Sequence, residues 1–378
     1  MTPRIVFFCG RSAEPWGPPS LDTTGIGGSE TAVVKIAERF ARDGWRVDVY
    51  CGAGRYEGEY EGVGYWEPSR LGYAGDDERA DVLVAWRQPA AHSLPVRARC
   101  RVVWLHDHNH GPDAGAELGR FDRVLGVSDY HRRFLGDAYG LENVGYVPNG
   151  IDLDRFDPTI KKVPGRCVYA SSPDRGLMLL LKLWPKIVGD QTHPELHVAY
   201  GWDNFDKWIG AGRHDMAAFK DECMRLIERT PRVVFRGRLP QDELARLYCE
   251  SYASLYPGDF CETSYIGGME AMAGGCVPVV SSVGATKETV ADGGLVVWGP
   301  NGTRSNPYSR AWQDFYVQCA RAVLFEANTR LSIRARGLER AKRLTWDRSY
   351  QEFWKPTVEA LLHGEAPAAE SEQEMVAA

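Results

Sequence analysis

Residues 256–280 read YPGDFCETSYIGGMEAMAGGCVPVV. The apolar run that ends at Tyr256 predicts a strand, and the small residues after it predict a loop. Residues 268–274 have the composition of a short buried helix, and 277–281 are rich in valine and predict a second strand. The order strand, loop, helix, turn and strand is that of a βαβ unit, which favours a parallel sheet.

The same alternation extends over most of the chain. In the first half we expect helices at 30–42 and 129–138 among strands at 5–9, 45–51, 81–86, 101–106, 123–127 and 143–147. In the second half, helical patterns separate expected strands at 166–170, 196–200, 233–236, 253–256 and 277–281. The fold class is therefore predicted to be α/β, with two Rossmann-like, doubly wound domains that face a cleft.

The chain has 378 residues, which exceeds the size at which a single core usually stops growing, so two domains are expected. Residues 148–158 are rich in Pro and Asp and have no period, and we interpret them as the crossover. The predicted domains are an N-terminal one over 1–158 and a second one over 159–345, followed by a C-terminal helix over 346–363 that packs back on the first. Residues 364–378 are acidic and rich in alanine, which is typical of a disordered tail.

Composition excludes several classes of protein. The hydrophobic fraction of 44% and the charged fraction of 25% are ordinary globular values and exclude wholesale disorder. No apolar run approaches the roughly 20 residues of a membrane helix, so no integral membrane segment is expected. The nine cysteines are scattered without CxxC spacing, which argues against disulfides and structural zinc and for a reducing, cytoplasmic compartment. The net charge of −6 offers no global attraction to nucleic acid, although composition leaves room for a local basic groove.

A glycine-rich segment, GIGGSE at 25–30, opens the first predicted helix. Glycine lets the backbone approach a ligand closely, and the free N–H groups of a helix N-terminus attract anions, so Gly27 and Gly28 could bind a phosphate. The spacing matches neither GxGxxG nor a P-loop. The alternative is a glycine turn in which Ser29 is the helix N-cap, and the segment alone does not decide between the two.

Three histidines and an aspartate lie in LHDHNH at 105–110, at the carboxyl end of a predicted strand. Open α/β sheets bind ligands at such ends, and His106, closest to the strand, is the one expected to face the cleft. A metal site is the alternative, but alternate residues of an extended segment point to opposite sides and no second ligand cluster is apparent, so no metal is predicted. For His108 and His110, a solvated polar loop remains an alternative.

Two carboxylates, Glu262 and Glu270, flank the start of the helix in the opening segment and are separated by seven residues. The two carboxyl groups of a glycosidase lie about 5 Å or about 6.5–9.5 Å apart. Eight helical steps would instead span about 12 Å, which fits two carboxylates that touch different parts of one elongated ligand. The alternative is a capping carboxylate and a charge on the helix face.

With these residues in view, the sequence resembles a known family. Glu262-x7-Glu270 followed by Ala-Met-Ala-Gly-Gly-Cys-Val-Pro-Val-Val is similar to the signature of retaining, GT-B-fold glycosyltransferases of the family-4 type. Further matches occur in the order that the family has them, at 27–30, 147–152, 171–177 and 234–239. The resemblance extends over nearly the whole chain, and the order and spacing of the matches make it specific.

The resemblance implies roles for individual residues of the donor site. Glu270 falls on the family's contact to the ribose of a nucleotide-sugar, and Glu262 falls beside the transferred sugar. Backbone amides at Ile266 and Gly267 fall on the diphosphate, at a helix N-terminus.

Other positions of the family fall on both halves of the chain. Arg175 stands where the family has a phosphate-loop lysine, which keeps the charge and adds a bidentate fork. The family's arginine five or six residues earlier is missing, because Tyr169 and Ala170 stand there. Charge compensation then falls to Arg175 and to Arg236 or Arg238. The family's sugar-facing histidine falls on His106, and Gly27 and Gly28 match its first glycine-rich loop.

The implied activity is transfer of a sugar, such as a hexose, from a UDP- or GDP-sugar to a hydroxyl-bearing acceptor. Configuration at the anomeric carbon is retained, and neither a metal nor another cofactor is expected. Irregular segments at 12–24 and 56–77 could hold the acceptor. Two other readings stay open: a GT-B-fold nucleotide-sugar epimerase, and a protein that binds sugar nucleotides without turnover or acts on a macromolecule such as modified DNA. Net acidity disfavours a nucleic-acid partner.

Overall fold

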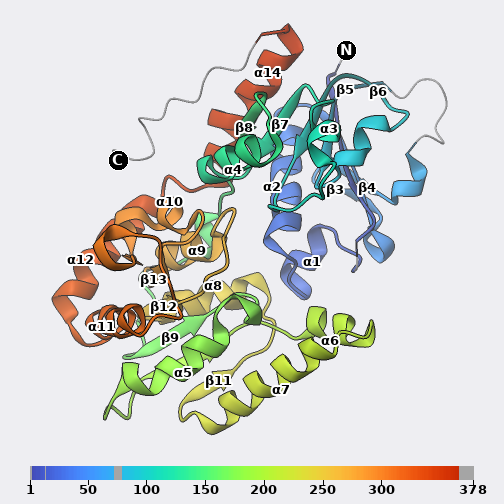
Figure 1. The fold of residues 1–378 in the computed structure, drawn as a ribbon. Coiled ribbons are helices and arrows are strands. Elements are labelled where there is room, and N and C mark those ends of the chain that lie inside the picture. Colours follow the sequence, from blue (N-terminus) through green and yellow to red (C-terminus); the bar gives the residue numbers. More distant parts are fainter. Residues whose placement is uncertain (1, 13, 72–78, 366–378) are drawn as a thin grey trace. The chain divides into compact units, whose positions relative to one another are not determined.

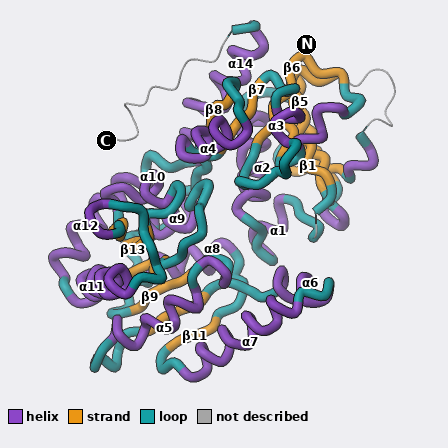
Figure 2. The backbone as a smooth tube through the Cα atoms, viewed as in Figure 1, coloured by secondary structure: helices purple, strands orange, loops and turns teal. Residues whose placement is uncertain are grey.

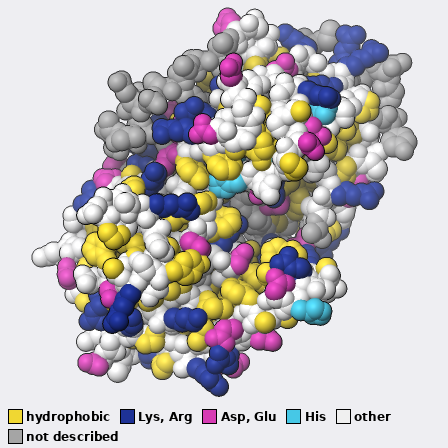
Figure 3. All heavy atoms as spheres, viewed as in Figure 1, with side chains coloured by type: hydrophobic (Ala, Val, Ile, Leu, Met, Phe, Trp, Pro, Cys, Tyr) yellow, Lys and Arg dark blue, Asp and Glu magenta, His cyan; other side chains and the backbone are white. Residues whose placement is uncertain are grey.

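The structure is a computed structural model that describes residues 2–12, 14–71 and 79–365. Helices and strands alternate along the chain, as Figures 1 and 2 show, and the architecture is mixed α/β as predicted. On the face shown in Figure 3, Lys and Arg side chains are interspersed with Asp and Glu and do not gather in one stripe. Within the described ranges, no helix is both long enough and apolar enough to cross a bilayer.

The chain divides into two compact units. Unit 1 comprises Met1–Gly150 and Leu344–Ala378, and unit 2 comprises Ile151–Arg343. The sequence prediction placed the two boundaries at 158 and 345, so the observed division comes earlier in the chain at both points. Most of the predicted disordered tail, 366–378, lies outside the described residues.

Unit 1 is built on an eight-stranded sheet with the order β3-β4-β2-β1-β5-β6-β7-β8. Neighbouring strands run parallel except β3 and β4, which pair antiparallel. The strands are β1 (Arg4–Gly10), β2 (Arg46–Cys51), β3 (Gly58–Tyr60), β4 (Val63–Trp66), β5 (Arg79–Trp86), β6 (Arg97–Trp104), β7 (Arg123–Gly126) and β8 (Val144–Tyr146). The helices are α1 (Pro18–Thr23), α2 (Gly28–Arg42), α3 (Ala114–Leu118), α4 (Asp129–Tyr139), α13 (Trp346–Arg348) and α14 (Lys355–His363).

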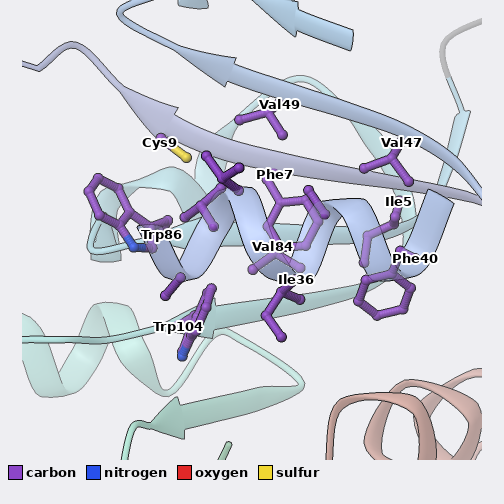
Figure 4. Close-up of a cluster of buried hydrophobic side chains, with 14 of the residues drawn as sticks. Ile5, Phe7, Cys9, Ile36, Phe40, Val47, Val49, Val84, Trp86 and Trp104 are labelled. Atoms are coloured by element: carbon purple, nitrogen blue, oxygen red, sulfur yellow. The ribbon is translucent and has the colours of Figure 1, made fainter. Parts of the chain in front are cut away.

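Strand β1 carries apolar side chains on both of its faces. Ile5 and Phe7 belong to the core that contains Ile36 and Phe40 of α2, as Figure 4 shows, whereas Val6 belongs to a separate cluster. Successive side chains of a strand point to opposite faces, so a strand with both faces covered reads as a continuous apolar run. This is the reason why 5–9 could be recognised as a strand from its sequence.

The C-terminal segment completes the core of unit 1. Trp346, Tyr350, Trp354 and Val358 recur every four residues, and all four are buried in the same cluster as Phe7. A π-helical turn over Ser349–Trp354 joins α13 to α14. Pro356 is the second residue of α14, which follows this π-helical turn directly.

Unit 2 is built on a six-stranded sheet with the order β11-β10-β9-β12-β13-β14, in which neighbouring strands run parallel. The strands are β9 (Arg166–Tyr169), β10 (Glu195–Val198), β11 (Val233–Phe235), β12 (Ala253–Tyr256), β13 (Val277–Ser281) and β14 (Leu295–Val297). The helices are α5 (Leu177–Val188), α6 (Asp203–Gly210), α7 (His214–Arg229), α8 (Gln241–Glu250), α9 (Ile266–Ala273), α10 (Thr286–Val290), α11 (Arg310–Phe325) and α12 (Ala327–Ala341).

The topology of unit 2 brings two distant loops together. Strands β9 and β12 are parallel neighbours, although more than 80 residues separate them in the sequence. The loops that follow them therefore leave the same edge of the sheet. Open α/β sheets bind ligands at the carboxyl ends of their parallel strands, so a site is expected at this edge.

Trp354 offers a test of the role of the C-terminal segment. Its side chain is fully buried, and its ring centroid lies 6.2 Å from that of Phe7, 6.1 Å from that of Phe40 and 4.8 Å from that of Trp104. Trp354→Ala should lower the free energy of unfolding by about 3–5 kcal/mol, because it leaves a cavity in the core. Urea unfolding followed by near-UV circular dichroism measures this loss. Phe315→Ala, at a half-exposed position, is the control, and an equal loss in both variants would contradict the assignment.

Candidate active site

Two glycines bring the loops after β9 and β12 into contact. Gly176 has φ +116°, and a Cβ atom there would lie 2.7 Å from the Cα atom of Gly258. A Cβ atom on Gly258 would lie 2.1 Å from the carbonyl oxygen of Arg175. Real Cβ contacts are not this short, and a residue other than glycine rarely adopts such a positive φ. The close approach of the two loops therefore depends on glycine at both positions.

This approach places Arg175 against Glu262. Nη1 of Arg175 donates to both carboxylate oxygens of Glu262, at 3.1 Å to Oε1 and 3.2 Å to Oε2. The guanidinium carbon also lies 4.0 Å from the centroid of the Phe260 ring. The Glu262 side chain is 7% exposed, whereas that of Arg175 is 35% exposed. The carboxylate is thus enclosed by the protein, while part of the cation faces solvent.

Tyr256, the last residue of β12, supplies a second donor to the same carboxylate. Its hydroxyl donates to Oε1 of Glu262 at 2.6 Å, and its ring packs against those of Tyr169 and Tyr265, with centroids 6.3 and 4.8 Å away. Burial raises the pKa of Glu262, and the Arg175 charge and the Tyr256 hydrogen bond offset only part of that rise. Burial lowers the pKa of Arg175, but Glu262, Tyr256, Asp174 and Tyr200 together outweigh this effect and raise the pKa, so Arg175 stays a cation.

Glu270 lies on α9, close to the end of that helix. Burial raises the pKa of this carboxyl to about 7, and the positive charge of Arg155 opposes the rise. Arg155 itself donates to Asp242 of α8 at 2.6 Å. The estimate of eight helical steps between the two glutamates is wrong, because α9 begins at Ile266 and Glu262 lies in the loop before it.

The first turn of α9 follows the Glu262 loop directly. Ile266 and Gly267 are its first two residues, and their amides belong to the N-terminal group that has no partner within a helix. The amides of Gly268 and Met269 are directed to the carbonyl oxygen of Tyr265, at 3.0 and 3.4 Å. The start of α9 therefore offers amide donors for an anion beside the Arg175–Glu262 pair.

Arg238 is the predicted donor residue that lies apart from this pair. It follows β11, which is separated from β9 by β10 in the sheet. Its Nη1 atom lies 3.8 Å from Oδ2 of Asp203, at the start of α6. The structure thus brings Arg175, Glu262, Ile266 and Gly267 together in one stretch of the sheet edge, with Arg238 further along it.

In unit 1, Gly27 and Gly28 open helix α2 as predicted. The N-cap residue is Gly27, which has no side chain, and Ser29 lies inside the first turn. The alternative in which Ser29 is the N-cap is therefore wrong. The Ser29 hydroxyl donates to the Glu30 carboxylate at 3.0 Å, and a Cβ atom on Gly27 would lie 2.3 Å from that carboxylate. Glu30 thus folds back over the first turn of the helix.

His106 lies two residues after the end of β6. Its ring is buried, with centroids 4.6 Å from Trp104 and 6.0 Å from Trp86. Burial is the main cause that lowers the pKa of His106 well below its usual value, and the Arg87 charge adds to it, so the imidazole is neutral at pH 7.

The histidines around His106 hold the same loop in place. Nε2 of His110 and Nε2 of His131 lie 2.7 and 3.0 Å from the carbonyl oxygen of Asp107. The His108 ring packs against Phe134, with centroids 4.4 Å apart. His108 and His110 are thus partly buried and make contacts within unit 1. No group of three or more His, Cys, Asp or Glu side chains that could hold a metal ion is found within the ranges that the structure describes.

Sequence reasoning missed Arg87, which follows β5 at the same sheet edge. Its φ of +57° is uncommon for a residue with a side chain. Its Nε donates to Asp107 at 2.6 Å, and its Nη1 lies 3.5 Å from the Ser29 hydroxyl. The available signal was a cation directly after a predicted strand. Tyr256 was also missed, because a tyrosine at the end of a buried strand reads as a core residue.

The chain is similar to known glycosyltransferases in part of its sequence and in its fold. Residues 26–155 match the family model described as Glycosyltransferase Family 4. No curated protein matches the chain in sequence. Among solved structures, sucrose-phosphate synthase from Thermosynechococcus elongatus is similar, with a TM-score of 0.73 and 16% sequence identity, covering 96% of this chain and 100% of that one.

Two further structures show the same likeness. Anabaena HepE in complex with UDP and glucose has a TM-score of 0.68 and 17% identity, covering 93% of this chain and 98% of that one. An α,α-trehalose-phosphate synthase (UDP-forming) from Burkholderia vietnamiensis has a TM-score of 0.70 and 11% identity, with 96% and 98% covered. These likenesses confirm the predicted fold class, two Rossmann-like domains of the GT-B type.

Substitution of Gly258 tests how the two loops are joined. Gly258→Ala should force the loop after β9 away from the loop after β12, because the new methyl group would overlap the Arg175 carbonyl. We expect the free energy of unfolding to fall by about 1–3 kcal/mol, as for other overpacked sites, and the Arg175–Glu262 contact to be lost. Chemical denaturation and a crystal structure of the variant measure the two effects. Gly210→Ala, where nothing lies within 4 Å of the added atom, is the matched control. An intact ion pair in Gly258→Ala would contradict this account.

Proposed function

We propose that this chain, a glycosyltransferase with the GT-B fold, transfers a hexosyl group from a nucleotide-sugar to an acceptor hydroxyl with retention of configuration and without a metal ion. The observation that carries the proposal is the enclosed carboxylate of Glu262, held by Arg175 and Tyr256 directly before the N-terminus of α9. A carboxylate, a cation and free amides in this order match the needs of a sugar joined to a diphosphate.

The donor would lie along the sheet edge of unit 2. The proposal assigns the ribose to Glu270, the diphosphate to Arg175 and the amides of Ile266 and Gly267, and the sugar to the side of Glu262. Arg175 contacts Glu262 through Nη1 alone, and its Nε and Nη2 groups donate to no other residue in the described part of the chain. The same guanidinium can therefore donate to a phosphate while it keeps its contact with Glu262.

The chemistry breaks the bond between the anomeric carbon and the diphosphate oxygen, and the electron pair leaves with that oxygen. Arg175 and the α9 amides stabilise the negative charge that grows there. The acceptor oxygen attacks the same face of the sugar, forms the new bond and gives its proton to the leaving phosphate. The carboxylate of Glu262 stabilises the positive charge that develops on the sugar ring.

The proposal extends to unit 1 by resemblance. Gly27 and Gly28 would meet the diphosphate through backbone amides, and His106 would contact the transferred sugar. Because the His106 imidazole is neutral at pH 7, it can donate a hydrogen bond to one sugar hydroxyl and accept a hydrogen bond from another.

In unit 2, Arg238 would add positive charge further along the donor.

UDP-sugars are the favoured donors, with GDP-sugars as the other candidates. Support comes from the complexes and names of similar structures: HepE is described with UDP and glucose, and the trehalose-phosphate synthase is described as UDP-forming. The interspersed charges on the face in Figure 3 give no support to a nucleic-acid acceptor.

The test is a panel of UDP-, GDP-, ADP- and TDP-sugars, each incubated with and without sugar and sugar-phosphate acceptors. We expect nucleotide release with one UDP- or GDP-sugar and a product whose anomeric configuration, read by ¹H NMR, equals that of the donor. Glu262→Gln should lower the rate by about a hundredfold or more, because it removes a charge that stabilises the transition state.

Glu339→Gln, at an exposed position of α12, is the matched control and should leave the rate unchanged. Isomerised donor without release would point to an epimerase. Inverted product would contradict retention, and no turnover of any donor would contradict the whole proposal.

Glu270 gives this function a pH dependence. Ribose hydroxyls donate to the ionised carboxylate, and the pKa of about 7 means that protonation competes with donor binding below neutral pH. The affinity for the donor sugar nucleotide should fall about tenfold between pH 8 and pH 6, since the ionised fraction falls by that factor. Isothermal titration calorimetry with UDP-glucose measures this change. Glu270→Gln should bind more weakly at pH 8 and show no such slope, and a slope equal to that of the wild type would contradict the assignment.

A further inference from the structure

We infer that Tyr256 is a positioning residue for the transfer reaction, whose hydroxyl holds the Glu262 carboxylate in its working orientation. The inference rests on the proposed function for the role of Glu262. The contact itself rests only on the structure, in which the Tyr256 hydroxyl lies 2.6 Å from Oε1 of Glu262.

The placement of the hydroxyl is rigid. Tyr256 ends β12, a strand in the interior of the six-stranded sheet, and only 1% of the residue is exposed. Its ring is nearly parallel to that of Tyr169, at an interplanar angle of 21°, and is tilted by 31° to that of Tyr265. The ring therefore has little freedom to rotate, and the position of the hydroxyl follows from the sheet.

The buried hydroxyl of Tyr256 requires a hydrogen-bond partner. A phenylalanine would fill the same volume, and burial of a hydroxyl costs free energy unless the group finds a hydrogen-bond partner. The partner is Glu262, whose Oε1 atom accepts from both Tyr256 and Arg175. A hydrogen bond to a charged group is among the stronger ones in proteins, particularly where water is excluded.

Arg175 and Tyr256 contact the Glu262 carboxylate directly. Asp174, from the loop after β9, and the hydroxyls of Tyr169 and Tyr265 interact with it electrostatically. Arg175 and Tyr256 favour the ionised carboxylate, whereas Asp174 opposes it. When Arg175 also donates to a diphosphate, its charge is shared between two anions. Tyr256 is then the donor that serves Glu262 alone.

The test compares Tyr256→Phe with wild type over pH 5 to 9. The substitution removes one oxygen and keeps the ring and its contacts with Tyr169 and Tyr265. Loss of the donor should move the acid limb of kcat to higher pH by about one unit, because Glu262 then protonates more readily, and should leave the affinity for the donor unchanged within about twofold. Tyr316→Phe, which removes a buried hydroxyl that donates to the Val279 carbonyl at 3.0 Å, is the control and should leave the limb in place.

A double variant separates positioning from a merely structural role. In the Glu262→Gln background, Tyr256→Phe should change kcat by less than about twofold, because the carboxylate that it serves is gone. An acid limb at its wild-type position, or an equal loss of kcat in both backgrounds, would overturn the inference.

A second measurement does not depend on turnover. Titration of ¹³C-labelled glutamate side chains by NMR, with the Glu262 signal assigned through Glu262→Gln, should show a higher pKa for Glu262 in Tyr256→Phe than in wild type. An unchanged pKa would overturn the inference even if no donor were turned over. Absence of turnover together with the expected shift would instead overturn the proposed function and leave the positioning contact established.

Discussion

The carboxylate of Glu262 is buried, and that constraint shapes the part of unit 2 around it. A buried charge is costly unless it is paired and hydrogen-bonded, so Glu262 needs donors that are themselves held in place. Arg175 reaches it only because the loops after β9 and β12 touch at Gly176 and Gly258. Tyr256 reaches it from the end of the strand. The two glycines, the tyrosine rings and the Arg175–Glu262 ion pair therefore all contribute to the burial of the Glu262 charge.

The parallel sheet makes this solution available. Neighbouring strands β9 and β12 release their loops at the same edge, so residues 175 and 262 meet although 87 positions separate them. In unit 1, β5 and β6 are neighbours in the same way and bring Arg87 to Asp107. Each unit thus carries a cation–carboxylate pair across two adjacent strand ends, which is a consequence of the fold class and not of local sequence.

A feature can be predicted from the sequence when it leaves a local pattern of residues, and it cannot when it depends on contacts between distant segments. Strands buried on both faces leave continuous apolar runs, and amphipathic helices leave periodic patterns. The segments 5–9 and 30–42 could therefore be placed correctly as β1 and α2. Contacts between loops leave no such pattern. The spacing of Glu262 and Glu270 gave a wrong estimate of eight helical steps between them, because periodicity does not show that α9 begins only at Ile266. Tyr256 escaped notice because a hydroxyl at the end of an apolar strand shows its purpose only when its partner is known.

Tyr169 anchors the loop that carries Arg175. The glycosyltransferase family that this sequence resembles has a lysine at the position of Arg175. It also has an arginine five or six residues before that lysine, where this chain has Tyr169 and Ala170. Tyr169 is buried, stacks on Tyr256 and donates to the Ser172 carbonyl at 2.7 Å, which anchors the loop that carries Arg175. A lysine is a single point charge, whereas a guanidinium can hold Glu262 with one nitrogen and a phosphate with the others. Under the proposed function, one forked cation on a loop anchored by a tyrosine would serve where the family uses two cations.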